Sequence, residues 1–204
     1  MDKIINLSAL IMGAGLSSRL PGANKLLLDW QGKPILLHTI SNVLAAGFHE
    51  VLVVLGNDED EFKSALQGFG NEIKIITNSN YKKGLTSSIQ QGVDAADDQT
   101  NGFIICLGDM FGIKGFDYAE LARYHLLNTH EDELITLPKV GDKTGNPVIF
   151  SQSFRFRIMH HDDPEGCKLI VKTARHSVQY FKSNRHQFLQ DIDTWDDYHR
   201  LSER

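Results

Sequence analysis

The sequence predicts an α/β protein with three α/β/α layers around a doubly wound, mostly parallel sheet. Short runs rich in valine, isoleucine and leucine recur along the chain, helical patterns separate them, and a glycine-rich loop follows the first run. Apolar runs with little alternation are typical of parallel strands that are covered on both faces. The 204 residues suffice for one such domain and are few for two, so we expect a single domain over residues 1–204.

Strand and helix patterns alternate up to about residue 140. Five buried strands are predicted, at residues 7–12, 51–56, 73–78, 103–108 and 133–138. Four helices are predicted, at residues 34–47, 58–70, 85–96 and 117–130. Pro34 suits the start of the first helix and Gly47 suits its end. This order predicts right-handed crossovers, with ligands at the carboxyl edge of the sheet.

The pattern changes after about residue 140. Residues 141–151 read as a turn and a strand, residues 155–166 are polar and irregular, and residues 178–182 read as a short strand. We interpret residues 141–185 as an excursion that covers the site before the chain returns. The tail ends in a helix, for which Thr194 and Asp197 have the spacing of a capping pair.

Composition narrows the classes of function. A formal charge of -5 and a pI near 6.0 argue against a broad nucleic-acid surface, so phosphate chemistry here needs a local cluster of cations. The first apolar run is too short for a signal sequence and no later run has the length of a membrane helix, so we expect a cytoplasmic protein. Cys106 and Cys167 lack CxxC spacing, and we assign them no redox role.

The loop GAGLSSRLPGANK, residues 13–25, is rich in hydrogen-bond donors and positively charged, which is typical of an anion site. It is not an ATPase phosphate loop, because no Gly-Lys pair in the chain is followed by Ser or Thr. The dinucleotide fingerprint begins correctly with Gly13 and Gly15, but Ser18 stands where the third glycine belongs. A dinucleotide site is therefore the less favoured alternative.

Two further segments carry carboxylates. Asp109 follows Gly108 at the end of the fourth predicted strand, which places it on the same edge as the glycine loop. It suits Mg²⁺, which binds one or two carboxylates plus substrate oxygens, although on position alone a turn or a helix cap is the favoured explanation of an aspartate there. In the tail, Asp191 and Asp193 point the same way in an extended chain, and Asp193 also suits the first turn of the last helix.

Together these segments resemble the nucleotidyltransferases of the MobA-like fold. Their signature, A-x-G-x-S-x-R-[ML]-G-x-x-K after a strand, is similar to residues 14–25 with a one-residue extension. The segments LLLDWQGKPILLHTI, KGLTSSIQQGV, LGDM, GNPVIF and DIDTWDDY follow in the order found in molybdenum cofactor cytidylyltransferases. The resemblance covers nearly the whole chain and implies a fold like that of the nucleotide-diphospho-sugar transferases.

The resemblance implies transfer of CMP from CTP to molybdopterin, with Mg²⁺ and release of pyrophosphate. It assigns the triphosphate to Arg19 and Lys25, and the metal to Asp109 with Asp193 as a second contact. The remaining nucleotide contacts that it implies are Ala14, Gly15, Ser17, Ser18, Thr86, Ser87, Ser88 and Gly108. The Ser-Ser form of KGLTSSIQQG looks like the cytidylyl branch of the family. A molybdenum hydroxylase that receives the product is the implied partner.

The residues expected to bind the acceptor match the family's motifs less closely. Phe111 stands where the family usually has proline after GDM, and DPEGCK stands where relatives often have GDKGAR. Asn146, Gly166 and Lys168 are the candidate acceptor contacts. The acceptor is alternatively a sugar or polyol phosphate, and a nucleotide-binding oxidoreductase or a non-catalytic binder are alternatives from other classes.

Two further features have simpler explanations. His160 and His161 are adjacent and point in different directions, so we favour a solvated loop over a metal site and keep contact with the acceptor as the alternative. Trp30 and Trp195 are interpreted as packing residues rather than stacking platforms for a ring.

Overall fold

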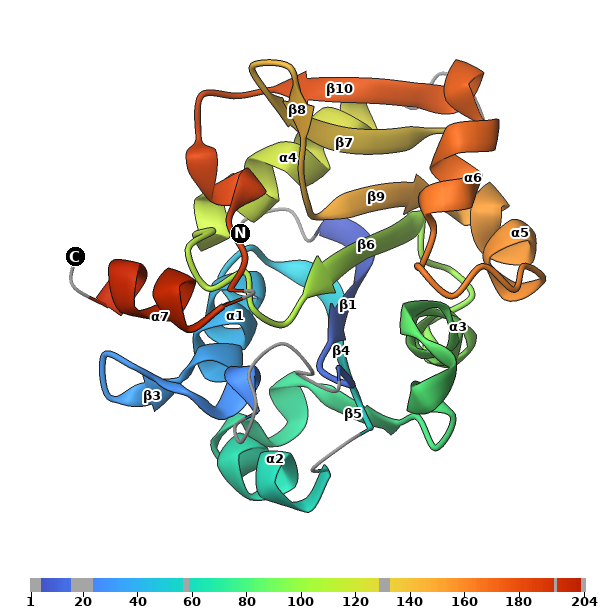
Figure 1. Cartoon of the computed structure of the whole chain (residues 1–204). Coiled ribbons are helices and arrows are strands. Elements are labelled where there is room, and N and C mark those ends of the chain that lie inside the picture. The colour runs from blue at the N-terminus through green and yellow to red at the C-terminus, as the bar shows by residue number, and fades with distance from the viewer. Residues whose placement is uncertain (1–4, 16–23, 57–58, 129–132, 193, 203–204) are drawn as a thin grey trace.

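A computed structural model describes residues 5–15, 24–56, 59–128, 133–192 and 194–202, and its centre is an eight-stranded sheet (Figure 1). From one edge the strands run in the order β5, β4, β1, β6, β9, β7 and β10, and β8 pairs with β7. The strands are β1 (Ile5–Met12), β4 (Phe48–Leu55), β5 (Lys74–Thr77), β6 (Gly102–Leu107), β7 (Ile135–Val140), β8 (Lys143–Thr144), β9 (Val148–Ser151) and β10 (Val178–Lys182). A separate small sheet pairs β2 (Asp29–Trp30) with β3 (Lys33–Pro34).

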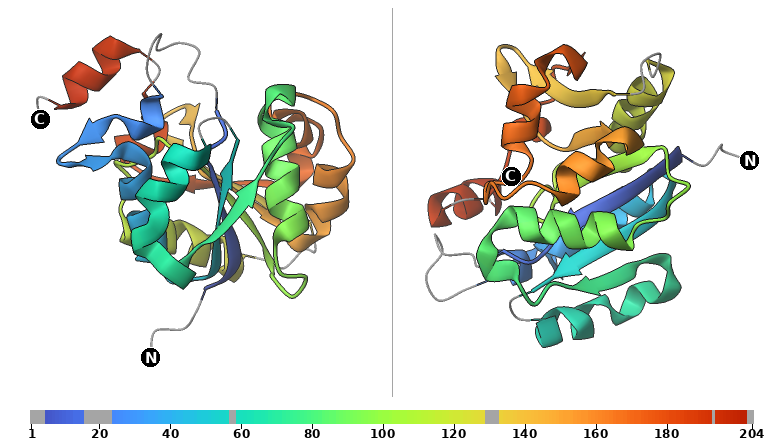
Figure 2. Two further views of the ribbon diagram at one scale, coloured as in Figure 1. Left: turned by 90° about the horizontal axis from the view of Figure 1, so that it is seen from below. Right: turned by 90° about the vertical axis from the view of Figure 1, so that its right-hand side faces the viewer.

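Helices cover both faces of the sheet, as Figure 2 shows from below. One face packs on α1 (Ile35–Leu44), α2 (Glu59–Leu66) and α4 (Gly115–Leu127), and the other packs on α3 (Leu85–Ala95), α5 (Arg155–Met159) and α6 (Lys168–Thr173). The central strand β1 divides its side chains between these two cores. Ala9 and Ile11 lie in the first core, whereas Leu10 and Met12 lie in the second. This alternation is the two-residue period of a strand that is buried on both sides.

The predicted fold class is confirmed. The five predicted strands correspond to β1, β4, β5, β6 and β7, and the four predicted helices correspond to α1 to α4. The sheet is parallel except for β9, which runs antiparallel to β6 and β7, and for the short β8. At the C-terminus, α7 (Trp195–Ser202) begins with the expected capping pair. Thr194 N donates to Asp197 Oδ2 at 3.0 Å, and Asp197 N donates to Thr194 Oγ1 at 3.1 Å.

The prediction of an irregular segment at residues 155–166 is wrong for its first five residues, which form α5. Packing against α3 explains this helix. Ile158 is fully buried in the core beside α3. The guanidinium of Arg155 donates to the carbonyls of Val93 at 2.8 Å and Ala96 at 3.2 Å, which satisfies the end of α3. Both contacts are long-range, so local sequence alone did not indicate them.

Residues 141–185 contribute strands to the sheet. They provide β9, which lies between β6 and β7, and β10, which forms the edge beside β7. That these residues also cover the site, and that residues 1–204 form one domain, stay predictions. Over the part of the chain that is described, we find no helix with the length and apolar character needed to span a bilayer.

The strand order reverses between β1 and β6. From β1 the chain proceeds to β4 and β5 on one side, and later places β6 on the other side. Met12 and Leu107, the last residues of these two strands, are direct partners in the ladder. The carboxyl ends of β1 and β6 therefore meet at the topological switch point, where open α/β sheets bind their ligands.

Candidate functional site

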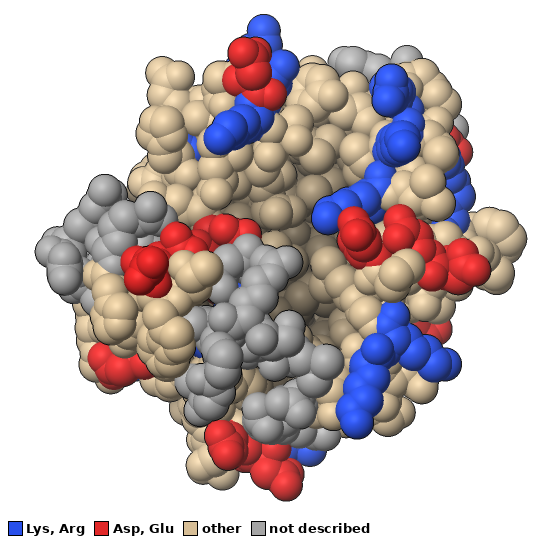
Figure 3. All heavy atoms as spheres, viewed as in Figure 1, with Lys and Arg blue, Asp and Glu red and all other residues tan. Residues whose placement is uncertain are grey.

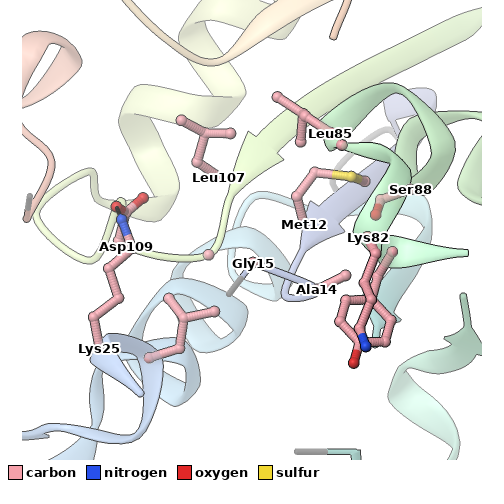
Figure 4. A pocket seen from close by; sticks show the side chains of 13 residues that line it. Met12, Ala14, Gly15, Lys25, Lys82, Leu85, Ser88, Leu107 and Asp109 are labelled. Atoms are coloured by element: carbon pink, nitrogen blue, oxygen red, sulfur yellow. Dashed lines mark hydrogen bonds and ion pairs between the residues drawn. The ribbon is translucent and has the colours of Figure 1, made fainter. Parts of the chain in front are cut away.

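A cavity of about 290 Å³ opens at this switch point. Figure 3 shows the hollow in this face of the molecule, and Figure 4 shows the residues that line the cavity. They come from the end of β1 and the loop after it, from the turn at Lys25–Leu27, from the segment around Tyr81–Lys83 and the start of α3, and from the end of β6. Four segments that are distant in sequence thus share one site.

Lys25 and Asp109 face each other across one side of this cavity (Figure 4). Lys25 Nζ lies 2.5 Å from Asp109 Oδ2 and donates a second hydrogen bond, of 3.1 Å, to the carbonyl of Ile192. The Asp109 side chain is only 5% exposed, and a carboxylate that buried requires a cation or several donors. Lys25 at the end of the basic loop and the strand-end carboxylate therefore meet in one cleft, although they are 84 residues apart in sequence.

Local structure explains why these two side chains meet. Asn24 Oδ1 accepts from Leu26 N at 3.1 Å and caps the short turn that carries Lys25, while the buried Leu26 anchors this turn to the core. Gly108 holds the end of β6 close to β1, because a Cβ at this position would lie 2.8 Å from the carbonyl oxygen of Met12. Thr39 Oγ1 donates to the Gly108 carbonyl at 2.8 Å and fixes the turn that presents Asp109.

The opposite wall is formed by Tyr81, Lys82 and the start of α3. Ser88 lines it, and its Oγ accepts from the buried Asn78 Nδ2 at 3.0 Å. Thr86 and Ser87 do not line the cavity. Thr86 Oγ1 hydrogen-bonds to the carbonyl of Asp163, and Ser87 Oγ donates to the carbonyls of Asn80 and Gly84.

Several predicted site residues are placed elsewhere. Ala14, Gly15 and Gly108 line the first cavity as expected, whereas Asn146 lines a second cavity of about 540 Å³ beside it. Gly166 and Lys168 line neither cavity. Gly166 adopts φ +80° and packs against Leu85, where a Cβ would lie 2.9 Å from Cδ2 of that leucine. Lys168 is exposed and pairs with Glu165 at 3.1 Å.

Four predicted residues, Ser17, Ser18, Arg19 and Asp193, lie outside the described residues, and their roles stay predictions. Asp191 is described, is exposed, and lines the second cavity.

Tyr81 and Lys82 are among the residues of the first cavity that sequence reasoning missed. Tyr81 packs closely on Gly56, where a Cβ would lie 2.6 Å from the tyrosine Cβ. Lys82 Nζ lies 5.9 Å from the centroid of the Tyr81 ring and adds a second cation to the cavity. The available signal was the basic pair Lys82 and Lys83 at the start of the predicted base-binding segment, which begins at Lys83.

Trp30 and Phe111 form a packing cluster beside the site. Their ring centroids lie 4.5 Å apart, and both belong to a hydrophobic cluster with Ile35 and the tail residue Ile192. The packing interpretation of Trp30 is confirmed. Phe111, the residue after GDM, thus packs with Ile192 of the tail. The carbonyl of Ile192 accepts a hydrogen bond from Lys25.

The histidine pair has local contacts. His160 Nδ1 lies 2.8 Å from the carbonyl oxygen of Phe156, and its ring stacks on the Phe156 ring. Desolvation lowers the pKa of His161, which favours its neutral form. Within the described ranges, no group of three or more His, Cys, Asp or Glu side chains is arranged to hold a metal ion. Burial raises the pKa of both cysteine thiols, Cys106 and Cys167, so both stay protonated near neutral pH.

Comparisons with known proteins agree with this geometry. The sequence profile of the MobA-like NTP transferase domain matches residues 9–179. The nicotine blue oxidoreductase of Paenarthrobacter nicotinovorans is 22% identical over 200 residues, which cover 95% of each chain.

Three solved structures, of two proteins, illustrate the shared fold. The crystal structure of Rv0371c from Mycobacterium tuberculosis H37Rv has a TM-score of 0.82 and 23% identity over 97% of this chain and 98% of its own. The same protein has been solved in complex with manganese, with a TM-score of 0.77, 20% identity and the same coverage. CMP:2-keto-3-deoxy-manno-octonic acid synthetase complexed with CTP has a TM-score of 0.73 and 17% identity over 97% of both chains.

Proposed function

The chain belongs to the MobA-like NTP transferase domain family, and on that premise we propose that it transfers CMP from CTP to molybdopterin and releases pyrophosphate. The observation that carries the proposal is the Lys25–Asp109 pair at the switch point of the sheet. One site there offers a cation for phosphate oxygens and a carboxylate for a metal ion, and nucleotidyl transfer requires both.

The reaction joins two anions. An oxygen of the acceptor phosphate attacks the α-phosphorus of CTP, the bond from that phosphorus to the bridging oxygen breaks, and pyrophosphate departs with the electron pair. Cations must offset the repulsion between the partners and the charge that develops on the leaving group. Lys25 and Lys82 supply positive charge from two sides of the cavity. An acceptor phosphate is already ionised near pH 7, so no strong general base is needed.

Oxygen donors at this site fit a divalent cation. The Asp109 carboxylate and the Ile192 carbonyl already surround one positive charge, the ammonium of Lys25. Mg²⁺ takes one or two carboxylates plus substrate phosphates, and Asp109 with Asp193 would hold it. When bound, the ion neutralises phosphate charge. The manganese complex of the related Rv0371c supports a divalent metal.

A cytidine nucleotide is favoured by two observations. The segment at the start of α3 has the Ser-Ser form of the cytidylyl branch, and Ser88 from it lines the cavity. The synthetase of the same fold that was solved with CTP adds support. We further propose that a molybdenum hydroxylase receives the dinucleotide product.

Product formation tests this proposal. The protein is incubated with Mg²⁺, molybdopterin and each of the four NTPs, and both pyrophosphate release and the mass of the product are measured. We expect the cytidine dinucleotide and fastest release with CTP. Pyrophosphate release only with a sugar or polyol phosphate would assign the alternative acceptor. If no acceptor supports pyrophosphate release, the protein is a non-catalytic binder.

An oxidoreductase is the second candidate, because the likeness to nicotine blue oxidoreductase extends over 95% of both chains. Titration with NAD(P)H and with flavin separates the two classes. Tight binding of either cofactor, without binding of CTP and Mg²⁺, would favour the oxidoreductase.

A further inference from the structure

The start of α3 forms one wall of the first cavity and also contacts a segment from much later in the chain. Gly84, Leu85 and Ser88 line the cavity (Figure 4). Leu85 and Ser88 are three residues apart, so they share one face of the helix. Thr86 does not line the cavity and bonds instead to the segment between α5 and α6, residues 160–167. The first turn of α3 therefore joins the cavity to this segment.

The hydroxyl of Thr86 uses both of its bonding capacities on the segment. Thr86 Oγ1 donates to the carbonyl of Asp163 and accepts from Gly166 N at 3.0 Å. These partners come 77 and 80 residues later in the chain, and Thr86 is only 4% exposed. A hydroxyl that is buried and bonded on both sides fixes the distance between the two chain segments that it joins.

Contacts on either side of Thr86 strengthen the same junction. The first turn of α3 has no side-chain cap, and Leu85 N donates to the carbonyl of Pro164 at 3.0 Å, which satisfies one of the N–H groups that a helix start leaves free. Gly84 permits this approach, because a Cβ there would lie 2.6 Å from the Pro164 carbonyl oxygen. One turn further along, Gln90 Nε2 donates to the carbonyl of His161 at 2.9 Å.

The cavity-lining residues of α3 are held by buried groups rather than by solvent. Ser88 is 4% exposed, and its Oγ accepts from Asn78 Nδ2, a side chain that is itself 1% exposed. Leu85 packs against Gly166, where a Cβ would lie 2.9 Å from its Cδ2. Residues 160–167 line neither the first nor the second cavity. Their contacts with the first cavity therefore pass through the start of α3.

We propose that Thr86 is a positioning residue for the nucleotide, because its hydroxyl ties α3 to residues 163–166 and so holds Leu85 and Ser88 in the cavity wall. The inference rests on the proposed nucleotidyl transfer. It assigns residues 163–166 to support of the nucleotide wall, although their motif resembles the segment that was expected to contact the acceptor. A wall that is already ordered costs less free energy when the ligand binds.

Thr86→Val tests the inference, because valine keeps the shape of the side chain and removes both hydrogen bonds. Equilibrium binding of CTP with Mg²⁺ and the KM for each substrate are measured. We expect the Kd and the KM for CTP to rise by about five- to tenfold, in the range for one or two neutral hydrogen bonds, while the KM for the acceptor stays within about twofold. Thr86→Ser keeps the hydroxyl and should restore CTP binding to within about twofold of the wild type.

Thr100→Val is the matched control. Thr100 is also buried, and its hydroxyl also donates to a carbonyl and accepts from a glycine N–H, in this case both of Gly102. It precedes β6 and so lies at the end of that strand opposite the first cavity. This variant loses the same kind of hydrogen bonds, and its affinity for CTP should equal that of the wild type.

Gly166→Ala tests the same junction from the other side and does not depend on the folding of Thr86→Val. Its new Cβ would lie 2.9 Å from Leu85 Cδ2, so we expect it to displace Leu85 and weaken CTP binding. Gly47→Ala is its control, because both glycines have φ +80° and no heavy atom lies within 4 Å of the Cβ position at Gly47. Thermal unfolding of each variant measures how much of the fold is retained.

Three results would overturn the inference. They are CTP binding that is unchanged in both Thr86→Val and Gly166→Ala, equal weakening in Thr86→Val and Thr100→Val, and a rise in the KM for the acceptor without a change for CTP. Any of these, with normal CTP binding by the wild type, would reject this inference alone. A wild type that binds no NTP in the presence of Mg²⁺ would reject the proposed function itself.

Discussion

The two neighbouring cavities are built in different ways. The first lies at the ends of the parallel strands β1 and β6, and its central charges, Lys25 and Asp109, neutralise each other within the protein. The second lies between connecting segments, and the side chains of Asp142, Asn146 and Gln190 in its wall have no hydrogen-bond or ion-pair partner among the described residues. The difference indicates a division of labour. Under the proposed function, the ends of the sheet strands would hold the triphosphate, and the connecting segments would contact the acceptor.

Removing the carboxylate is expected to have the largest effect. Asp109→Asn keeps the shape of the side chain but loses the charge that pairs with Lys25 and would hold the metal ion. We expect pyrophosphate release to fall about 100- to 1,000-fold, in the range for loss of one preorganised electrostatic contact. Near-normal turnover would show that the first cavity does not contain the machinery. Asp94→Asn serves as the matched control and should retain full activity.

Replacement of Lys25 is expected to have the second largest effect. Lys25→Ala should raise the KM for CTP by about 10- to 100-fold, because a charge-assisted contact of roughly 1.5–3 kcal/mol to the phosphates is lost. The KM for the acceptor should change less than twofold. Equal losses for both substrates would contradict the separation of the two cavities. Lys172→Ala, an exposed lysine in the last turn of α6, controls for general loss of positive charge.

The strand-end glycine tests the scaffold beneath the first cavity. In Gly108→Ala the new Cβ would lie 2.8 Å from backbone, the Met12 carbonyl oxygen. We expect the free energy of unfolding to fall by about 1–3 kcal/mol, as for overpacked interiors. Urea denaturation measures this loss. Gly68→Ala should change stability by less than about 0.5 kcal/mol, because no heavy atom lies within 4 Å of its Cβ position.

A buried histidine gives the scaffold its own pH dependence, which must be separated from that of the site. Burial lowers the pKa of His125 from 6.5 to about 4, and its Nδ1 lies 2.7 Å from Thr136 Oγ1. The unfolded chain therefore binds a proton between about pH 6.5 and 4 that the folded chain does not. Stability is unaffected by this group above pH 6.5 and falls as the pH drops toward 4.

Between pH 7.5 and 5.0 this linkage predicts a loss of about 2 kcal/mol in the free energy of unfolding. Urea denaturation at the two pH values measures it, and His125→Gln should remove this part of the slope. An unchanged slope in the variant would show that other groups cause the acid sensitivity.

The smallest effect is expected in the second cavity. Asn146→Ala should raise the KM for the acceptor by about fivefold, one neutral hydrogen bond, and leave the KM for CTP within twofold. Steady-state kinetics with each substrate varied in turn measures both values. A change in the KM for CTP alone would assign Asn146 to the nucleotide and merge the two cavities into one functional site.

The sequence alone was sufficient to predict the strands at the centre of the sheet and the closeness of Lys25 to Asp109. Strand-length apolar runs identify β1 and β6, and the rule that ligands bind at the carboxyl edge places the residues after these strands together. Both predictions depend on local patterns and one general rule of topology.

Long-range contacts decided what the sequence did not reveal. Thr86 does not line the first cavity, and its hydroxyl bonds instead to the carbonyl of Asp163, 77 residues later. The helix α5 forms because Arg155 satisfies the end of α3. The second cavity exists because the turn at Gly145 packs on the tail at Phe188. None of these pairings has a periodicity or a spacing that a single sequence displays.

A thermal-shift titration of CTP with Mg²⁺ tests the proposed triphosphate site most directly, because a ligand that binds only the folded chain raises its melting temperature. The titration is run on the wild type, Asp109→Asn, Lys25→Ala and Asp94→Asn. Stabilisation of the wild type and of Asp94→Asn by CTP more than by the other NTPs, with little or none in the two site variants, is the predicted result. The same stabilisation in all four proteins would show that Lys25 and Asp109 do not hold the nucleotide.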